Sequence, residues 1–394
     1  MHYTSLRSRS ALAALIIASH LLAGCAPDSP LSDPPFGPED SARFEAALDA
    51  TFASQGAPGA TMIVHRHGDD ARVWTGQRGA VSLAPGAAAV TEHTLFRTAS
   101  SAKTFIGALI LALHDEGRLS VNDPISAFTD MVPGGDAITL RMLMQHTSGV
   151  ANYTQCTTYR DAAMADPNHL FTYEELVSLS VAEGPDFPPD TGWNYSNTGY
   201  ILLGMVAESL VNRPLEEELE ARFFGPLGMH DTAPLANMPP PAMWTGYVVR
   251  DGEITESLPG GAYVADGGAW VTSLHDLTVW AEAFFGGRLH RPETMALAQG
   301  TGGGELLNGV ARAFDLATGG YGHGLIVASD DTLGVLLAGA GNGGGARTFV
   351  GYLPEHDLSF AVAVSAGDGS VPIVETLSAT GPILEALRDV LAAR

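Results

Sequence analysis

The sequence predicts an α/β fold in which an antiparallel sheet, flanked by N- and C-terminal helices, carries a large and mostly helical insertion. Strand-like segments gather near the two ends of the domain, whereas short helical patterns with many Gly and Pro breaks fill its middle. Strands from both ends can join in one sheet that the terminal helices cover. We therefore expect the sheet to use residues of about 41–100 and 315–394, and the helical region to span about 101–300.

The first part of the domain is predicted as a helix, a hairpin and a second helix. Residues 41–53 repeat a large apolar side chain every four positions, which is typical of an amphipathic helix. Apolar segments at 59–67 and 72–81 indicate two strands joined by a Gly-Asp-Asp turn. Residues 104–116 are apolar on most sides, which predicts a buried helix that Gly117 ends.

The rest of the domain alternates helical patterns with strands near its end. The clearest helices of the middle region are predicted at 200–210 and 274–285. Three C-terminal strands are predicted at residues 332–338, 348–353 and 358–365. Pro382 opens a last helix with leucines on one face, because proline is well tolerated at the first position of a helix.

The first 24 residues are predicted to be a lipoprotein signal peptide. A basic start precedes an apolar run at 11–23, which is too short to span a bilayer as a mature helix. The tetrapeptide Leu-Ala-Gly-Cys that ends at Cys25 resembles a bacterial lipobox, in which the cysteine carries lipid. The only other cysteine, Cys156, then has no disulfide partner.

The lipobox leads to an expectation about where the domain works. Residues 25–40 are rich in proline and lack periodicity, which predicts an extended tether before a domain at 41–394. We expect an exported bacterial lipoprotein, a monomer held by its lipid anchor at the periplasm-facing membrane surface of the cell envelope. The net charge of −24 makes nucleic acid an unsuitable partner, because phosphate binding needs a basic surface.

A single lysine marks the candidate catalytic centre. The chain contains 19 Arg but one Lys, Lys103, which follows Ser100 by three residues. Arginine stays charged near neutral pH, whereas burial can bring a lysine into the range where it acts as a base. Positions i and i+3 share a helix face, so the two side chains can meet and Lys103 can activate the hydroxyl. Taken alone, the spacing also fits a chance serine beside a surface lysine.

A second group of polar residues is Tyr195-Ser196-Asn197. A tyrosine beside a cationic lysine has a lowered pKa and can relay protons, and an Asn amide can orient a substrate carbonyl. Taken alone, the same residues fit a loop that enters a helix with Asn197 as its cap.

Several ordered segments together resemble the family of class C β-lactamases, Streptomyces-type D-Ala-D-Ala carboxypeptidases and related esterases. The resemblance runs from about residue 41 to the end of the chain. The segments that carry it are Phe96–Phe105 (FRTASSAKTF), Ile138–Gly149 ending in His-Thr-Ser-Gly, Tyr195–Tyr200 (YSNTGY), Gly225–Met229 (GPLGM) and Phe349–Asp357 (FVGYLPEHD). It implies the β-lactamase/transpeptidase-like form of the predicted fold.

The resemblance also implies a mechanism. Ser100 attacks a carbonyl and forms an acyl-enzyme, while Lys103 and Tyr195 share the proton transfers. Asn197 holds the substrate amide, and the backbone N–H groups of Ser100 and Asn342 bind the oxyanion. No metal or organic cofactor is needed. The expected substrate is a D-Ala-type peptide or a β-lactam amide, so the activity is that of a D-alanyl-D-alanine carboxypeptidase or a β-lactamase.

The third motif of the family is altered. Where relatives carry Lys-Thr-Gly or His-Thr-Gly, the matching positions are Gly339, Ala340 and Gly341. The missing cation helps relatives to bind a substrate carboxylate, so its loss leaves a carboxylesterase open as an alternative. Arg347 or His323 could supply the charge instead.

Three other readings stay open. A non-catalytic cell-wall-binding module would suit the glycine-rich third motif, although the retained Lys103 argues against it. A zinc hydrolase would use His65-Arg66-His67-Gly68-Asp69, which matches H-x-H-x-D and puts both histidines on one strand face. An ordinary α/β-hydrolase needs Gly-x-Ser-x-Gly, and the nearest match, at Ser365, lacks the first glycine.

Overall fold

The computed structural model describes most of the chain from residue 33 onward. The described residues are 33–166, 169, 171–235, 243–250, 252–257, 270–302, 316–367 and 381–393. The predicted signal peptide and Cys25 lie outside them. Within these ranges, no helix is both long and apolar enough to cross a membrane.

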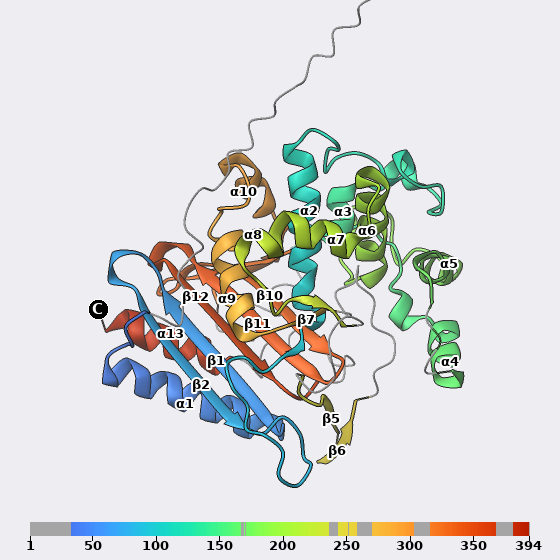
Figure 1. Cartoon of the computed structure of the whole chain (residues 1–394). Helices are drawn as coiled ribbons and strands as arrows, with labels where there is room; N and C mark the ends of the chain where they lie inside the picture. Colours follow the sequence, from blue (N-terminus) through green and yellow to red (C-terminus); the bar gives the residue numbers. More distant parts are fainter. Residues whose placement is uncertain are drawn as a thin grey trace, which may run out of the picture.

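One antiparallel sheet of seven strands forms the centre of the molecule, in the order β2-β1-β12-β11-β10-β9-β8 (Figure 1). Its strands are β1 (Gly59–Arg66), β2 (Arg72–Gly79), β8 (Thr318–Tyr321), β9 (Ile326–Asp330), β10 (Gly334–Gly343), β11 (Ala346–Leu353) and β12 (Leu358–Val364). β12 lies between β1 and β11, so strands from the two ends of the domain meet at this point. The predicted fold class is confirmed.

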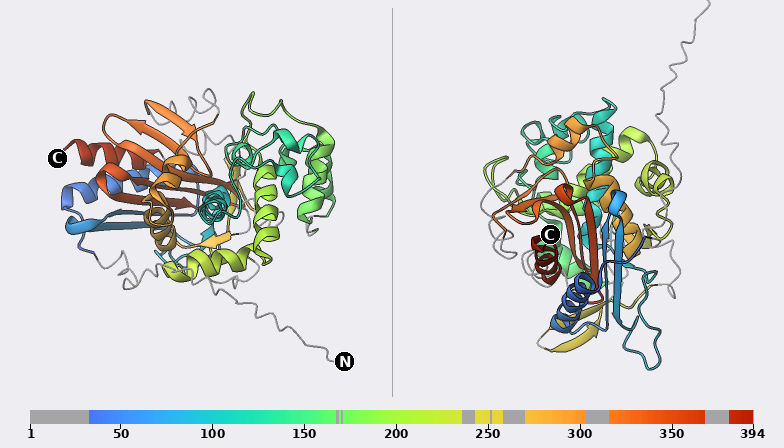
Figure 2. Two further views of the ribbon diagram at one scale, coloured as in Figure 1. Left: turned by 90° about the horizontal axis from the view of Figure 1, so that it is seen from above. Right: turned by 90° about the vertical axis from the view of Figure 1, so that its left-hand side faces the viewer.

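The central strands are buried on both faces. Every residue of β1 and β12 is buried, which explains why both segments are largely apolar rather than strictly alternating. One face of the sheet is covered by α1 (Pro38–Gln55) and α13 (Pro382–Ala392), which pack side by side (Figure 2). This side of the molecule has its own apolar core, to which α1 contributes Phe44 and α13 contributes Leu384.

The N-terminal segment before α1 corrects the predicted tether. α1 begins at Pro38 rather than Ser41, with proline in its first turn and Gly56 in the left-handed conformation after its end. Phe36 is 4% exposed and packs edge-to-face on Phe44, with ring centroids 5.2 Å apart. Pro34 accepts a hydrogen bond from the N–H of Val73 in the edge strand β2. Residues 33–40 therefore belong to the domain and not to a tether, because the side chain of Phe36 is buried in its core.

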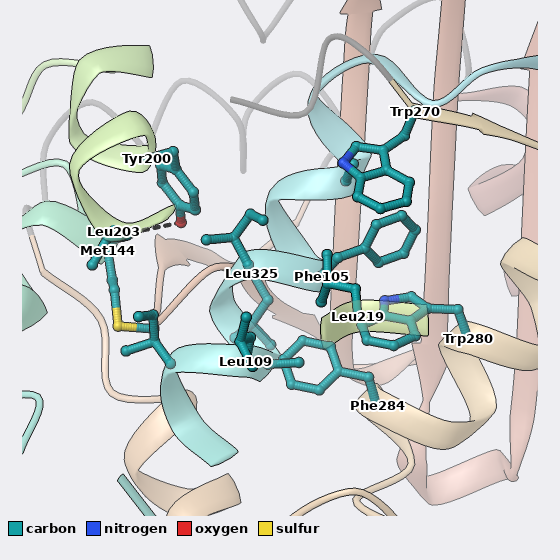
Figure 3. Close-up of a cluster of buried hydrophobic side chains, with 14 of the residues drawn as sticks. Phe105, Leu109, Met144, Tyr200, Leu203, Leu219, Trp270, Trp280, Phe284 and Leu325 are labelled. Carbon is teal, nitrogen blue, oxygen red and sulfur yellow. Dashed lines mark hydrogen bonds between the residues drawn. The ribbon is translucent and has the colours of Figure 1, made fainter. Parts of the chain in front are cut away.

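The other face of the sheet carries the helical region. α2 (Lys103–Asp115) is buried along nearly its whole length, as its all-round apolar pattern predicts. Phe105 contacts the rings of Trp280 and Trp270 at centroid distances of 4.7 and 6.0 Å (Figure 3). α9 (Leu274–Trp280) crosses β1 and β12 and continues as a short π-helix to Phe285, so the predicted helix at 274–285 is present.

Further helices form the outer part of this region. They are α3 (Leu140–Met144), α4 (Thr157–Ala165), α5 (Tyr173–Glu183), α6 (Asn197–Val211), α7 (Leu215–Leu219), α8 (Gly225–Leu227) and α10 (Pro292–Ala298). Short strands form two smaller sheets. In one, β7 (Trp270–Thr272) lies between β3 (Phe96–Arg97) and β4 (Ala233–Pro234), and in the other, β5 (Tyr247–Arg250) pairs with β6 (Glu253–Glu256).

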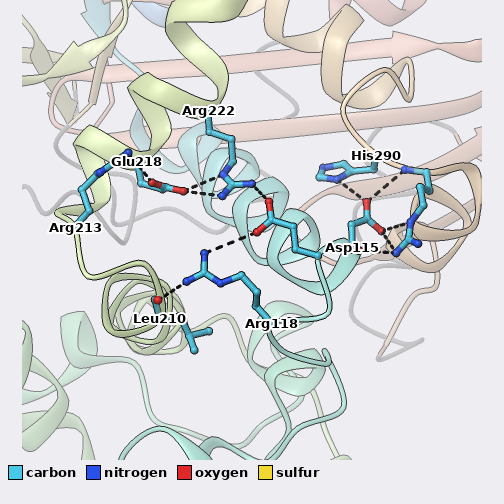
Figure 4. A network of polar contacts seen from close by, with 9 residues as sticks. Asp115, Arg118, Leu210, Arg213, Glu218, Arg222 and His290 are labelled. Carbon is cyan, nitrogen blue, oxygen red and sulfur yellow. Dashed lines mark hydrogen bonds and ion pairs between the residues drawn. The ribbon is translucent and has the colours of Figure 1, made fainter. Parts of the chain in front are cut away.

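A polar network fixes the C-terminal end of α2 against its neighbours (Figure 4). Asp115 accepts hydrogen bonds from Arg291 and Thr294, and it lies 3.5 Å from the ring of His290. Arg222 joins the next residue, Glu116, to Glu218 of α7. Since α2 begins at Lys103, this network holds the far end of the helix that carries the candidate catalytic lysine.

Candidate active site

The candidate nucleophile lies in a short 3₁₀ turn, η3 (Ala99–Ala102), that leads from β3 into α2. Ala99 has φ 45°, a left-handed conformation that costs free energy for a residue other than glycine. The side chain of Ser101 is fully buried and bonded to Thr348 at 2.7 Å, whereas Ser100 is only half-buried. The turn therefore buries Ser101, whose hydroxyl stabilises the fold, and leaves Ser100 partly exposed.

Lys103 is buried directly beneath this turn. The residue is 1% exposed, and its Nζ donates to Ser100 Oγ at 3.3 Å and to Asn197 Oδ1 at 2.7 Å. The ammonium also lies 5.0 Å from the ring centroid of Tyr195 and 5.4 Å from that of Tyr200. Two oxygen acceptors and two aromatic faces stabilise a cation that burial alone would destabilise.

Tyr195 reaches the same hydroxyl from the loop before α6. Its Oη donates to Ser100 Oγ at 2.8 Å. The loop that carries it enters α6, whose N-cap is Ser196 and not Asn197, since the Ser196 hydroxyl accepts from the N–H of Gly199. The predicted set of Ser100, Lys103, Tyr195 and Asn197 is thus brought together, and Asn197 holds the lysine with its carbonyl oxygen.

The third motif lies on β10 where this strand passes η3. A Cβ atom on Gly341 would lie 2.5 Å from the Thr98 carbonyl oxygen and 2.9 Å from Ala99 Cβ. A Cβ on Gly339 would lie 2.9 Å from Thr104 Cγ2. Gly341 is needed because the strand and the backbone of the turn are in close contact there, whereas Gly339 faces the end of a side chain.

The other two residues predicted at this motif have their side chains on the opposite face. Ala340 belongs to the core beneath α1 and α13, so it can meet a substrate only through its backbone. Asn342 pairs with Arg347 across the hairpin, and directly opposite residues share a face. The backbone N–H of Asn342 stays a predicted oxyanion donor.

Neither residue considered as a replacement for the missing cation can serve. Arg347 donates to Gln55 of α1, on the face of the sheet away from Ser100. His323 is 1% exposed, and burial lowers its pKa to about 4, so that it is neutral near pH 7. The β10 side of the site therefore gains no positive charge from either.

Two aromatic residues near Tyr195, His146 and Tyr321, were not predicted as site residues. The His146 ring lies 4.4 Å from that of Tyr195, and the Tyr321 ring of β8 lies 4.6 Å from that of His146. Burial, together with the charge of Lys103, holds the pKa of His146 well below 6.5. The His-Thr-Ser-Gly segment was a signal for His146, but no local pattern indicated Tyr321.

Comparison with known proteins identifies the family. A family model described as Beta-lactamase matches residues 43–376. The chain belongs to this family. Penicillin-binding protein 4 of Amycolatopsis lactamdurans is 31% identical over 209 residues, which are 50% of this chain and 50% of that protein. Esterase EstB of Burkholderia gladioli is 29% identical over 48% of this chain and 50% of the esterase.

The chain spans about half the length of these curated relatives, whereas its match to a solved structure covers nearly the full length of that protein. A D-stereospecific amidohydrolase from Streptomyces sp. superposes with a TM-score of 0.70 at 26% identity, covering 86% of this chain and 98% of that one. The predicted resemblance to serine β-lactamase-related proteins is confirmed, and the proteins similar to this chain include a penicillin-binding protein, an esterase and an amidohydrolase.

The motifs that suggested a zinc hydrolase or an α/β-hydrolase have structural roles in this member of the Beta-lactamase family. His65 contacts Asp33 at 2.6 Å, and His67 contacts Ser359 at 2.9 Å and Glu282 at 3.0 Å. Among the residues that the structure describes, no group of three or more His, Cys, Asp or Glu could hold a metal ion. Ser365 is fully buried with its hydroxyl on the Gly59 backbone, so it cannot act as an exposed nucleophile.

Proposed function

We propose that the chain is a serine hydrolase that works through an acyl-enzyme on Ser100. The observation that carries the proposal is the convergence of two proton-transfer groups on one half-buried hydroxyl: Tyr195 Oη at 2.8 Å and Lys103 Nζ at 3.3 Å from Ser100 Oγ. The tyrosine distance lies within the usual range of about 2.6–3.2 Å for direct proton transfer, and the lysine distance lies just above it. Membership of the Beta-lactamase family supports the same chemistry.

The reaction has two halves. In the first, the Tyr195–Lys103 pair, with one of its own protons removed, accepts the proton of Ser100, whose oxygen attacks the substrate carbonyl, and the pair then returns the proton to the leaving group. In the second, water loses a proton to the same pair and attacks the ester carbonyl, and the pair returns that proton to Ser100 Oγ as the ester bond breaks. We assign the oxyanion to the N–H groups of Ser100 and Asn342, because β10 runs beside the nucleophile turn with Gly341 against Ala99.

The substrates that suit this site are neutral at the position that faces β10. Gly339 has no side chain there, and neither Arg347 nor His323 offers a charge that a substrate carboxylate could bind. We therefore infer primary amides and simple esters, including amides of D-amino acids, as the substrate class. The likeness to the D-stereospecific amidohydrolase supports amides, and the likeness to Esterase EstB supports esters.

A second candidate is the D-Ala-type peptide or β-lactam amide expected from the sequence. The 31% identity to Penicillin-binding protein 4 favours it. Hydrolysis of D-alanine amide and p-nitrophenyl acetate, compared with D-Ala-D-Ala and a penicillin, separates the two. We expect turnover of the first pair, abolished in Ser100→Ala, and slow reaction of the second pair. The reverse order would favour the second candidate, and no Ser100-dependent reaction with any of the four would favour a cell-wall-binding module.

We also propose that Cys25 carries a lipid that anchors a monomeric domain to the periplasm-facing membrane surface. The supporting observation is the Leu-Ala-Gly-Cys tetrapeptide after an apolar run. Metabolic labelling with a fatty-acid alkyne in a bacterial host should mark the wild-type chain and not Cys25→Ala. Equal labelling of both chains would contradict the anchor.

A further inference from the structure

His146 holds the loop of Tyr195 by three separate contacts. The backbone N–H of Asn194 donates to the carbonyl oxygen of His146 at 3.1 Å. The backbone N–H of Ser196 donates to His146 Nδ1 at 3.2 Å. The imidazole ring lies 4.4 Å from the ring of Tyr195 itself. One residue thus bonds to the neighbours on both sides of the candidate proton-transfer tyrosine and packs against its side chain.

The bond to Ser196 requires one protonation state. An N–H donor needs a lone pair at Nδ1, so the imidazole is neutral and its proton is on Nε2. The ring is 1% exposed, and three tyrosine rings surround it, those of Tyr195, Tyr200 and Tyr321. Lys103 is the charged group that acts on it, and this cation disfavours a second positive charge. The surroundings therefore keep Nδ1 available as an acceptor.

The backbone of His146 adds a further constraint. It has φ 61°, in the left-handed region that Asn adopts more readily than most residues. The residue follows α3, and the Tyr200 hydroxyl donates to the carbonyl of Met144 at the end of that helix. The His146 turn is thus fixed to α6 as well as to the Tyr195 loop, which gives the ring a defined place.

We propose that His146 is a positioning residue that fixes Tyr195 against Ser100 through the acceptor at Nδ1. The proposal rests on the proposed function, because it assigns Tyr195 a part in activating the serine. Without the acceptor, the N–H of Ser196 loses its partner, and the tyrosine hydroxyl is no longer held 2.8 Å from the nucleophile. A misplacement of about 1 Å is enough to lower the rate of a catalysed step by about 10²-fold.

The test measures the reactivity of Ser100 without knowledge of the natural substrate. A fluorophosphonate probe transfers its phosphonyl group to an activated serine oxygen and releases fluoride, and intact mass follows the adduct with time. The variants are His146→Leu, His146→Asn and His146→Gln, with Ser100→Ala as the negative control. His290→Leu is the matched control, because His290 is buried at the other end of α2, beside Asp115.

The choice of side chains isolates the acceptor. The Asn carbonyl oxygen can occupy the place of Nδ1, whereas the longer Gln amide reaches the place of Nε2. We expect the Leu and Gln variants to label about 10²-fold more slowly than wild type, and the Asn variant to label within about fivefold of it. His290→Leu should keep the wild-type labelling rate even where its melting temperature falls.

The outcomes distinguish a failure of the proposed function from a failure of the positioning role of His146. A wild-type chain that does not label at Ser100 would remove the proposed function and this inference together. A labelled wild type with an equally fast His146→Leu would overturn the inference alone. If the Leu variant does not fold, the Asn and Gln variants decide, and equal rates for these two would mean that the Nδ1 acceptor does not position Tyr195.

Discussion

Gly341→Ala tests the contact between β10 and the nucleophile turn. The added methyl group would lie 2.5 Å from the Thr98 carbonyl oxygen, 2.6 Å from Thr348 Oγ1 and 2.9 Å from Ala99 Cβ. The carbonyl belongs to the backbone just before the strained residue Ala99, so it cannot rotate away as a side chain would. The strand and the turn must therefore separate.

The size of this separation sets the expected loss. A carbon–oxygen contact is normally about 3.3 Å or longer, so the methyl group must retreat by about 0.8 Å. Overpacking of this kind costs about 1–3 kcal/mol of stability, and displacing the groups around Ser100 by nearly 1 Å lowers the rate by about 10²-fold. We expect kcat/KM for p-nitrophenyl acetate to fall by that factor, while the melting temperature falls by only a few degrees.

Gly339→Ala is the matched control for this variant. Its methyl group would meet Thr104 Cγ2 at 2.9 Å, which is the end of a side chain. Thr104 can yield, although its hydroxyl is bonded to Ser101 and to Trp280. We expect a loss of less than about tenfold in kcat/KM. A Gly341→Ala enzyme that keeps the wild-type rate, or a control that loses more than it, would refute the reasoning.

Three further predictions concern the lysine, the N-terminal segment and acid pH. Lys103→Arg keeps the charge but offers no base near neutral pH, so ester turnover should fall by about 10³-fold or more, and a loss under tenfold would contradict the role of the lysine. Phe36→Ala should lower the free energy of unfolding in urea by about 3 kcal/mol while kcat stays unchanged, and an unchanged urea midpoint would mean that the segment contributes no packing. Burial lowers the pKa of His65, His67 and His290 to about 4, so the unfolded chain binds their protons first as the pH falls below about 6.5. The free energy of unfolding is therefore highest above about pH 6.5 and falls toward pH 4, by about 3 kcal/mol for one such histidine. A melting temperature that stays constant between pH 7.5 and 5 would exclude this dependence.

The parts of the fold that sequence predicts are those with a strong local pattern. The strands at Gly59–Arg66 and Leu358–Val364 are apolar runs bounded by turn residues, and α2 is apolar on all sides. The two strands at Thr318–Tyr321 and Ile326–Asp330 were not predicted. The first contains two glycines among four residues and has no alternation, so only pairing with its neighbours makes it a strand.

The same division holds in the candidate site. Ser100, Lys103 and Tyr195 follow from spacing and from motif resemblance, and the structure brings them together. The positioning role that we propose for His146 depends on contacts with residues 48 to 50 positions away, and no local sequence pattern indicates such contacts. The face that the side chain of Ala340 occupies could not be predicted for a related reason, because the face of a strand residue is known only once the register is known.

The place of β12 between β1 and β11 sets an order on how the chain acquires its structure. Gly59 at the start of β1 bonds to Ser365 just after β12, a separation of 306 residues. At the usual rates of translation, about 15 to 60 s pass between the synthesis of these two partners. During that time the β1–β2 hairpin has an open edge and α1 lacks α13. β1 therefore joins the C-terminal strands only after Ser365 has been made, and the high sequence separation of this pairing makes its formation a slow step.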